Sequence, residues 1–290
     1  MLLLDKPVGL SSNAALQRAK RLYAAEKAGH TGTLDPLASG LLPLCFGDAT
    51  KFAQSLLDAR KAYIATVKFG MATTTGDTEG DVVSELPATF SRAALLAALP
   101  AFVGRITQIP PRYSALKFQG RNYYDYAREG VEIPRPAREV DVHTLELLGW
   151  APPEAVLRIA CGKGTYVRTL AEDLGLALGS CAHLAALRRT GAGPFAIGQA
   201  VTLDALERMD AGARDALLLA IDAPLAQMPR LDIDEDAALA LARGQMPAAP
   251  AGAAGRFRCC AGGGRFVGVV DAAAGVLRAV RLARTDTPPT

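Results

Sequence analysis

One stretch of the chain, residues 28–44, combines residue types that could do chemistry. It holds one imidazole, His30, and one carboxylate, Asp35, and the glycines and prolines around them predict a shaped loop. An apolar run at residues 41–46 follows and is typical of a buried strand. A polar loop that leads into a buried strand can hold a reactive side chain on a rigid base. An Asp followed by Pro also starts a plain turn, so the pair alone does not separate the two interpretations.

A second candidate region lies at residues 105–138, where basic and aromatic side chains are interleaved. Lys and Arg can meet phosphates and aromatic rings can stack on bases, as on an RNA-binding surface. A solvated helix face with its aromatic residues packed inward has the same composition. The many prolines and glycines predict an insertion outside the main sheet. The residues concerned are Arg105, Arg112, Tyr113, Lys117, Phe118, Arg121, Tyr123, Tyr124, Tyr126, Arg128, Arg135 and Arg138.

Composition excludes several classes of protein. The chain has 290 residues, 50% of them hydrophobic, so it is globular and not disordered. Its apolar runs are shorter than the ~18 residues of a membrane span, and the run at the N-terminus is too short for a signal peptide. Five scattered cysteines suit a reducing cytosol, and three histidines without metal-site spacing argue against a metal cofactor. The net charge of +3 does not by itself imply nucleic acid.

Two short motifs resemble known ligand-binding loops but lack residues that those loops require. Residues 162–165 resemble the end of a phosphate-binding loop, but Gly164 stands where that loop has Ser or Thr. The series Asp232, Asp234 and Asp236 resembles the start of a calcium loop without its Gly and Glu. A helix cap is the better interpretation of this acidic series.

Hydrophobic periodicity predicts the elements that must position the candidate residues. Helices are expected after the capping residues Ser11 and Ser91, and residues 71–81 are expected to be a long exposed loop. Strands are expected at residues 2–4, 41–46, 61–69, 140–148 and 155–161. Because strands and helices mix without βαβ alternation, we predict an α+β fold with a mixed, largely antiparallel central sheet flanked by helices. The prolines of residues 222–229 indicate a boundary between domains 1–229 and 230–290, the second small and β-rich.

Several sequence blocks, in order along the chain, match a known family. The stretch GHTGTLDPLASGLLP at residues 29–43 closely resembles the signature of the TruB family, the tRNA pseudouridine-55 synthases. The other similar blocks are LLLDKP (2–7), GDATK (47–51), KAY (61–63), PPRYSALKFQG (110–120), KGTYVRTL (163–170) and LRR (187–189). The resemblance implies the pseudouridine synthase fold, an RNA-binding thumb at about 105–138 and a PUA-like RNA-binding domain at 230–290.

The resemblance implies a catalytic role for Asp35, Tyr63 and Arg168. Cleavage of a glycosidic bond needs a carboxylate on the sugar side, and Asp35 matches the family's aspartate. Arg168 matches the arginine that pairs with it, and Tyr63 matches the tyrosine that packs against the target base and could take the proton from C5. By pattern alone, Arg168 could be a surface helix residue and Tyr63 a half-buried strand residue.

Substrate-binding roles are implied for further positions. Tyr166 and Leu187 match residues that line the base pocket, although each would as readily be ordinary core. His30 matches the histidine that occupies the space left when the uridine leaves the T-loop stack. In the thumb, the expected phosphate contacts are Arg112, Lys117 and Arg121.

The function implied by the resemblance is conversion of uridine-55 in the T loop of tRNA to pseudouridine. The steps are base flipping, aspartate-assisted glycosidic cleavage, base rotation and formation of the C5–C1′ bond. The implied partner is the T-arm stem-loop of tRNA, and we expect a cytoplasmic monomer with no cofactor, no membrane and no obligatory protein partner. Two alternatives stay open: a guide-RNA-dependent enzyme that modifies ribosomal RNA, and a tRNA-folding chaperone without catalysis.

Overall fold

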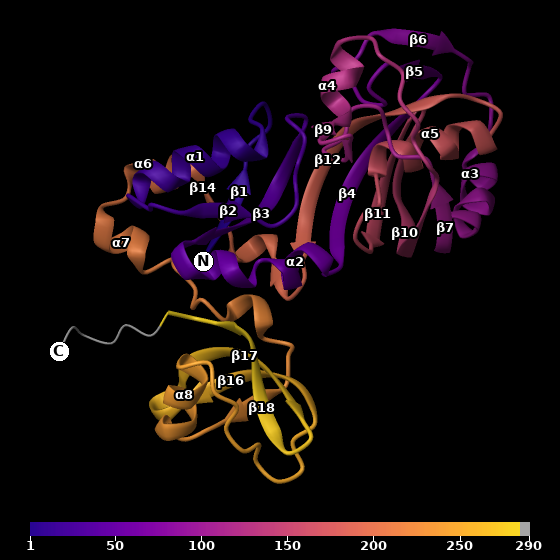
Figure 1. Cartoon of the computed structure of the whole chain (residues 1–290). Coiled ribbons are helices and arrows are strands. Elements are labelled where there is room, and N and C mark those ends of the chain that lie inside the picture. The colour runs from indigo at the N-terminus through magenta and orange to yellow at the C-terminus, as the bar shows by residue number, and fades with distance from the viewer. Residues whose placement is uncertain (285–290) are drawn as a thin grey trace.

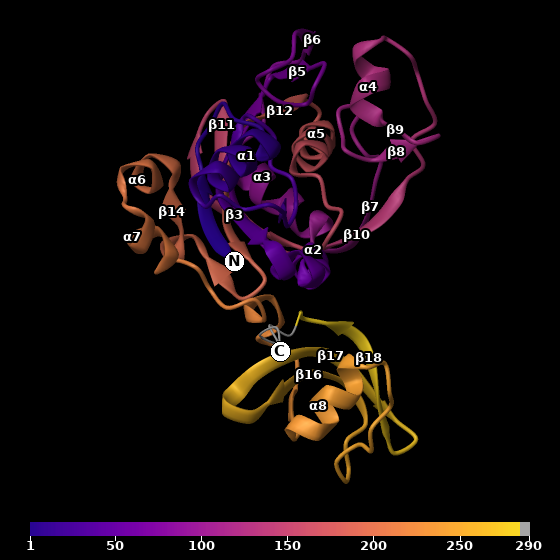
Figure 2. The same ribbon diagram turned by 60° about the vertical axis from the view of Figure 1, so that its left-hand side comes forward.

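A ten-stranded mixed sheet forms the body of the molecule (Figures 1 and 2). The computed structural model describes residues 1–284. Along the sheet the strands are β14 (Val201–Thr202), β1 (Leu2–Lys6), β3 (Ala38–Phe46), β12 (Ala182–Ala192), β4 (Lys61–Phe69), β11 (Glu154–Cys161), β10 (Arg138–Ala151) and β7 (Gly104–Gln108). The short strands β2 (Ala28–His30) and β13 (Phe195–Ala196) pair with β3 and β12. The β1–β14 and β12–β3 pairs are parallel and the others antiparallel, which confirms the predicted α+β fold.

The helices of this body are short and begin where the sequence provides caps. Ser11 and Ser91 accept hydrogen bonds from the backbone N–H groups of Ala14 and Ala94, as their capping role predicts. The α-helices are α1 (Ser12–Leu22), α2 (Gln54–Asp58), α3 (Arg92–Ala98), α4 (Tyr123–Arg128), α5 (Val167–Ala177), α6 (Leu203–Arg208) and α7 (Ala211–Asp215). The 3-10 turns are η1 (Gly47–Phe52), η2 (Leu99–Phe102), η3 (Ile197–Gln199) and η4 (Ala223–Leu225).

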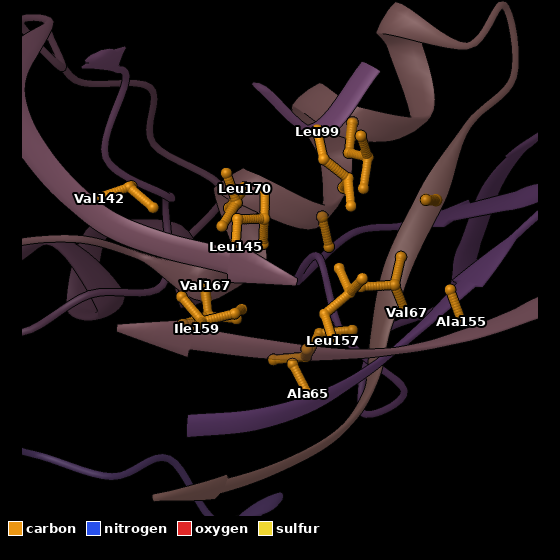
Figure 3. Packing of buried hydrophobic residues seen from close by; sticks show 14 of the residues in the cluster. Ala65, Val67, Leu99, Val142, Leu145, Ala155, Leu157, Ile159, Val167 and Leu170 are labelled. Atoms are coloured by element: carbon orange, nitrogen blue, oxygen red, sulfur yellow. The ribbon is translucent and has the colours of Figure 1, made fainter. Parts of the chain in front are cut away.

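The largest part of the core lies between α5 and the central strands (Figure 3). Alternate residues of β4 and β11 face it, so Ala65 and Leu157 pack beneath the helix residues Val167 and Leu170. This packing fixes α5 against the sheet. It therefore also fixes the residues at the start of α5, where Tyr166 and Arg168 lie.

A second, four-stranded sheet is built entirely from residues after Pro229 and lies below the first in Figure 1. Its elements are β15 (Arg230–Asp232), α8 (Glu235–Ala242), β16 (Gly255–Ala261), η5 (Gly262–Gly264), β17 (Arg265–Ala273) and β18 (Val276–Leu282). Asp234 caps α8 by accepting from Ala237 N–H at 2.7 Å, as predicted. Phe52 of the large body packs edge-on against Phe266 of β17, with ring centroids 5.0 Å apart.

Two segments differ from the sequence prediction. Residues 104–108 form the edge strand β7 of the main sheet, so the predicted insertion at 105–138 leaves the sheet only after Gln108. It then forms β8 (Lys117–Phe118), β9 (Arg121–Asn122) and α4, and we call residues 109–137 the thumb. The predicted exposed loop at 71–81 contains strand β5 (Met71–Thr73), which pairs with β6 (Val82–Glu85), and a buried aspartate, Asp77. Strand β7 pairs with β10, and Asp77 is buried against Arg168; both features depend on contacts with distant segments, which local composition does not encode.

Candidate active site

The loop between β2 and β3 is held rigidly by distant side-chain and backbone groups. The hydroxyl of Ser12, at the start of α1, accepts from Leu34 N–H at 2.7 Å and donates to Leu34 C=O at 2.9 Å. Gly9 N–H donates to Pro36 C=O at 2.8 Å. Asp35 lies between these two anchored residues, so its backbone is fixed while its side chain projects from the loop.

Asp35 forms an ion pair with Arg168 at the start of α5. The Oδ2 atom of Asp35 lies 2.9 Å from Nη2 of Arg168, and the arginine side chain is only 6% exposed while that of Asp35 is 40% exposed. The structure therefore brings together two residues that lie far apart in the chain. The guanidinium is fixed inside the protein, and the carboxylate keeps one side open.

Arg168 is held by three further groups. It donates through Nη1 to Thr75 C=O at 2.9 Å and through Nη2 to Tyr113 C=O at 2.7 Å. Its Nε lies 3.7 Å from Oδ2 of Asp77. Because the guanidinium has fixed planar geometry, these contacts set the direction from which it meets Asp35.

Asp77 is a site residue that the sequence analysis missed. Its side chain is 3% exposed, and its Oδ1 accepts from Thr75 Oγ1 at 2.5 Å and from Glu79 N–H at 3.0 Å. Leu184 N–H donates to Gly76 C=O at 3.0 Å and ties this turn to β12. The available signal was the Thr-Gly-Asp composition around Asp77, which is typical of a side-chain-stabilised turn as well as of an exposed loop.

Two carboxylates thus share one buried guanidinium. Burial raises the pKa of the Asp35 carboxyl above its ordinary value, the positive charge of Arg168 opposes this rise, and the negative charge of Asp77 adds to it. The net direction is upward. Asp35 is consequently a more basic carboxylate than an exposed aspartate.

A pocket of about 260 Å³ opens beside Asp35. Its walls include the ring of Tyr63 from β4, the ring of Tyr166 at the start of α5 and the aliphatic side chain of Leu187 from β12. The structure therefore brings all three predicted pocket residues to the carboxylate. Aromatic and apolar walls can hold a flat ring between them. The carboxylate at one side of the pocket can then contact the group that is bonded to this ring.

Tyr63 is a neutral phenol in this setting. Burial raises the pKa of the Tyr63 hydroxyl, and the guanidinium of Arg189 partly opposes that rise. A phenol with a raised pKa seldom ionises near neutral pH, so it is a weak general base. The environment favours packing against a bound ring over removal of a proton.

Arg189 is a second charged residue whose position the sequence does not reveal. It is 1% exposed and donates through Nε to Leu41 C=O at 2.6 Å and through Nη2 to Gly32 C=O at 3.2 Å. Gly40 makes this close approach possible, since a Cβ there would lie 2.3 Å from the Arg189 carbonyl oxygen and its φ is +102°. The glycine thus lets β12 lie close to β3 and bring Leu187 and Arg189 to the pocket.

Comparison with known proteins identifies the family. Residues 20–167 match the N-terminal domain of the TruB family pseudouridylate synthases, and residues 168–226 match the C-terminal domain of tRNA pseudouridylate synthase B. The chain belongs to the TruB family. The tRNA pseudouridine synthase B of Thiobacillus denitrificans is 55% identical over 285 residues, covering 98% of this chain and 96% of the relative. That of Burkholderia mallei is 53% identical over 292 residues, covering 98% and 97%.

Solved structures show the same fold at greater evolutionary distance. The crystal structure of a Cbf5–Nop10–Gar1 complex matches with a TM-score of 0.73 and 26% identity, and covers 98% of this chain and 83% of that one. The likeness extends over both sheets of this TruB family chain, because nearly its whole length is covered. The resemblance inferred from the sequence blocks is confirmed.

The remaining predicted binding residues of this TruB family chain lie outside the pocket lining. His30 ends β2, and burial together with nearby Arg189 lowers its pKa, so the imidazole is neutral near pH 7. In the thumb, the exposed guanidinium groups of Arg112 and Arg121 pair with Glu132 and Glu129, and Lys117 is exposed on β8. Exposed ion pairs of this kind are weak, so the glutamates can be replaced by other anions as partners of the two arginines.

Gln108 is another residue beside the pocket that the sequence analysis missed. It is 2% exposed at the end of β7, where the thumb begins. Its Oε1 accepts from Tyr166 N–H at 3.0 Å, and its Nε2 donates to Tyr166 C=O at 3.2 Å. One amide thus holds the backbone of a pocket residue two positions before Arg168.

Gln108→Ala is expected to lower the rate of product formation about tenfold, because two hydrogen bonds that position Tyr166 are lost. Single-turnover measurement with enzyme in excess separates this effect from substrate affinity, which should change little. Gln17→Ala is the matched control, since Gln17 is exposed on α1 and, within residues 1–284, its side chain bonds to Asn13 alone. An unchanged single-turnover rate in Gln108→Ala would show that the amide clamp is dispensable.

None of the helices formed by residues 1–284 has the length and apolarity to cross a membrane. Over the same residues, no group of three or more His, Cys, Asp or Glu side chains is arranged to hold a metal ion.

Proposed function

We propose that this protein is a tRNA pseudouridine synthase that converts uridine-55 in the T loop of tRNA into pseudouridine. The observation that carries the proposal is the Asp35–Arg168 pair at the wall of a pocket with aromatic and apolar sides. Family membership and relatives named tRNA pseudouridine synthase B support it. The enzyme class is an isomerase.

The reaction breaks one bond and forms one bond at the same ribose carbon. The C1′–N1 bond breaks, the uracil ring rotates within the pocket, and its C5 joins C1′. The proton on C5 leaves, and N1 of the product gains a proton. Atoms and electrons balance between uridine and pseudouridine, so the chemistry needs no cofactor.

Asp35 acts on the sugar side of this reaction, as nucleophile or as stabiliser of oxocarbenium character. Arg168 keeps the carboxylate oriented and limits the rise of its pKa, so that it ionises near neutral pH. Tyr63, Tyr166 and Leu187 hold the flipped uracil. The neutral Tyr63 phenol serves mainly as a packing surface during rotation of the ring.

Residues outside the pocket bind the rest of the RNA. Phosphates can replace Glu132 and Glu129 as partners of Arg112 and Arg121, and Lys117 adds a third cation on the thumb. The neutral imidazole of His30 can stack where the uridine stood. We propose that residues 1–229 are the catalytic domain and that residues 230–290 form a small RNA-binding domain.

A guide-RNA-dependent enzyme is the nearest alternative. The solved neighbour is a complex with other proteins, whereas the relatives at 53–55% identity carry the name of a tRNA enzyme. A chaperone without catalysis would not require the pairing of Asp35 with the buried guanidinium of Arg168. We therefore propose a monomer that acts in the cytoplasm on the tRNA T arm without a protein partner.

The proposal is tested by incubating the purified protein with an unmodified tRNA transcript labelled with tritium at C5 of uridine. Tritium release, followed by position mapping, should report pseudouridine at position 55 and at no other uridine. A transcript with cytidine at that position is the control for background release. Absence of pseudouridine from full-length tRNA and from the isolated T-arm stem-loop would refute the proposed activity.

The pH dependence of the rate follows from the raised pKa of Asp35. The ionised carboxylate is the working form, so the single-turnover rate should fall as pH falls through that pKa. This acid limb should lie above 3.8, the ordinary value for Asp. Single-turnover rates between about pH 4 and pH 8 at saturating enzyme measure it. A rate that stays constant down to the ordinary aspartate range would contradict the environment assigned to Asp35.

A further inference from the structure

Four cationic side chains of the described chain (residues 1–284) line the pocket, and three of them are committed to protein groups. Lys61 is 7% exposed, and its ammonium group donates to three backbone carbonyls at the end of α2 at 2.6–2.9 Å. Arg189 donates to two backbone carbonyls, and Arg168 is paired with Asp35. None of these three can turn toward a ligand without leaving its own partners uncompensated.

Lys163 is the fourth cation and differs from the others. Its side chain is 69% exposed, and its Nζ lies 3.0 Å from Oδ1 of Asp58, whose side chain is 44% exposed. Asp58 is the last residue of α2 and also accepts from Gln54 Nε2 at 3.1 Å. An exposed pair of this kind is worth about 0–1 kcal/mol, so the ammonium group can exchange partners readily.

The backbone around Lys163 is fixed, although its side chain is exposed and only weakly paired. Gly162 N–H donates to Asp141 C=O at 2.7 Å, and Thr165 Oγ1 donates to Gly162 C=O at 3.2 Å. Gly164 has a φ of +79°, and no heavy atom of the described residues lies within 4 Å of the position that its Cβ would take, so the turn is open on that side. The turn leads directly into Tyr166. Lys163 therefore lies at the opening of the pocket, and the fixed backbone of the turn sets its position relative to the base-binding residues.

A flipped nucleotide brings phosphates to this opening. If Asp35 meets the ribose, the phosphodiesters on the 3′ and 5′ oxygens of the same ribose remain outside the pocket. We propose that Lys163 binds one of these phosphodiesters and that Asp58 competes with the phosphate for the ammonium group. The inference rests on the proposed function, because the position of the ribose beside Asp35 is part of that proposal. Lys163 is then a substrate-binding residue, and Asp58 weakens binding of RNA to this enzyme.

Two single substitutions with opposite expected effects test the proposal. Lys163→Gln should weaken binding of an unmodified tRNA transcript about fivefold and lower the slope of log Kd against log salt by about 0.7 to 0.9, the value for one phosphate contact. Asp58→Asn should tighten binding about twofold, because the lysine loses its competing partner. In the double variant, the gain in affinity from Asp58→Asn should be smaller, because the ammonium group of Lys163, which this substitution releases, is absent.

Arg158 and Glu146 provide a matched control. They form an exposed pair at 2.8 Å, with side chains 56% and 53% exposed. Arg158 pairs with Ile64, the residue after Tyr63 on β4. Because successive side chains of a strand point to opposite faces of the sheet, Arg158 lies on the face away from Tyr63 and the pocket. Arg158→Gln and Glu146→Gln make the same charge changes and should leave Kd and its salt slope unchanged.

The outcomes separate this proposal from the proposed function. Filter binding across a salt series gives Kd and slope, and tritium release by the wild-type protein is measured first. If the wild-type protein forms no pseudouridine, the proposed function fails. If it is active and Lys163→Gln keeps the wild-type Kd and salt slope, the role of Lys163 is refuted. A purely structural tie between Lys163 and Asp58 would make both variants less stable, leave the salt slope unchanged and give no gain in affinity for Asp58→Asn.

Discussion

Asp35→Asn is expected to reduce pseudouridine formation by a factor on the order of 10³ or more while tRNA binding persists. The amide keeps the size and much of the hydrogen bonding of the carboxylate, but it cannot act as nucleophile or stabilise positive charge at C1′. A loss of that size corresponds to about 4 kcal/mol of transition-state stabilisation. Single-turnover tritium release and filter binding, measured on the same preparation, separate chemistry from affinity.

The stability of Asp35→Asn provides the control for folding. The pKa of Asp35 is raised in the folded protein, so the stability linked to its protonation is present at low pH and is lost as pH rises through the folded pKa. At neutral pH the ionised carboxylate therefore costs stability, which the substitution removes. The thermal midpoint of Asp35→Asn should equal or exceed that of wild type. An active Asp35→Asn enzyme would exclude the assigned role, and an inactive one with a lowered midpoint would point to damage of the fold.

Local sequence signals predict the elements of the fold well. Strand β4 runs from Lys61 to Phe69, as its alternation predicts, because Ala65, Val67 and Phe69 are the residues that pack into the core. Ser11 is a cap because a short hydroxyl side chain reaches the free N–H groups of the first turn. These features depend on neighbouring residues only, so the sequence encodes them directly.

Features that depend on distant contacts could not be predicted in this way. Asp77 lies in a segment with loop composition, and it is buried because Arg168 and β12 come from elsewhere to meet it. Arg189 contradicts the tendency of arginine to be exposed, since two backbone carbonyls replace water around its guanidinium. Likewise, the pairing of Asp35 with Arg168 was inferred from family resemblance, because spacing along the chain carries no information about it.

Arg168→Met is the second substitution with a large expected effect. It removes the positive charge between Asp35 and Asp77 and the donors to Thr75 and Tyr113. Breaking a buried pair in this way costs roughly 3–5 kcal/mol of stability. The single-turnover rate at neutral pH should fall by a factor on the order of 10² to 10³, because Asp35 loses both its orientation and the charge that keeps it ionised.

The pH profile distinguishes this electrostatic effect from simple unfolding. Arg168→Lys keeps the charge without the planar fork, so it should remain folded and recover part of the rate. Its acid limb should lie at higher pH than in wild type, because one ammonium group cannot meet all the partners of the guanidinium. Asp77→Asn should move the acid limb the other way, since the negative charge of Asp77 raises the pKa of Asp35. If the two variants moved the limb in the same direction, or left it in place, Asp35 could not be the group that titrates. Opposite shifts would show that one guanidinium and two carboxylates set the ionisation on which the reaction depends.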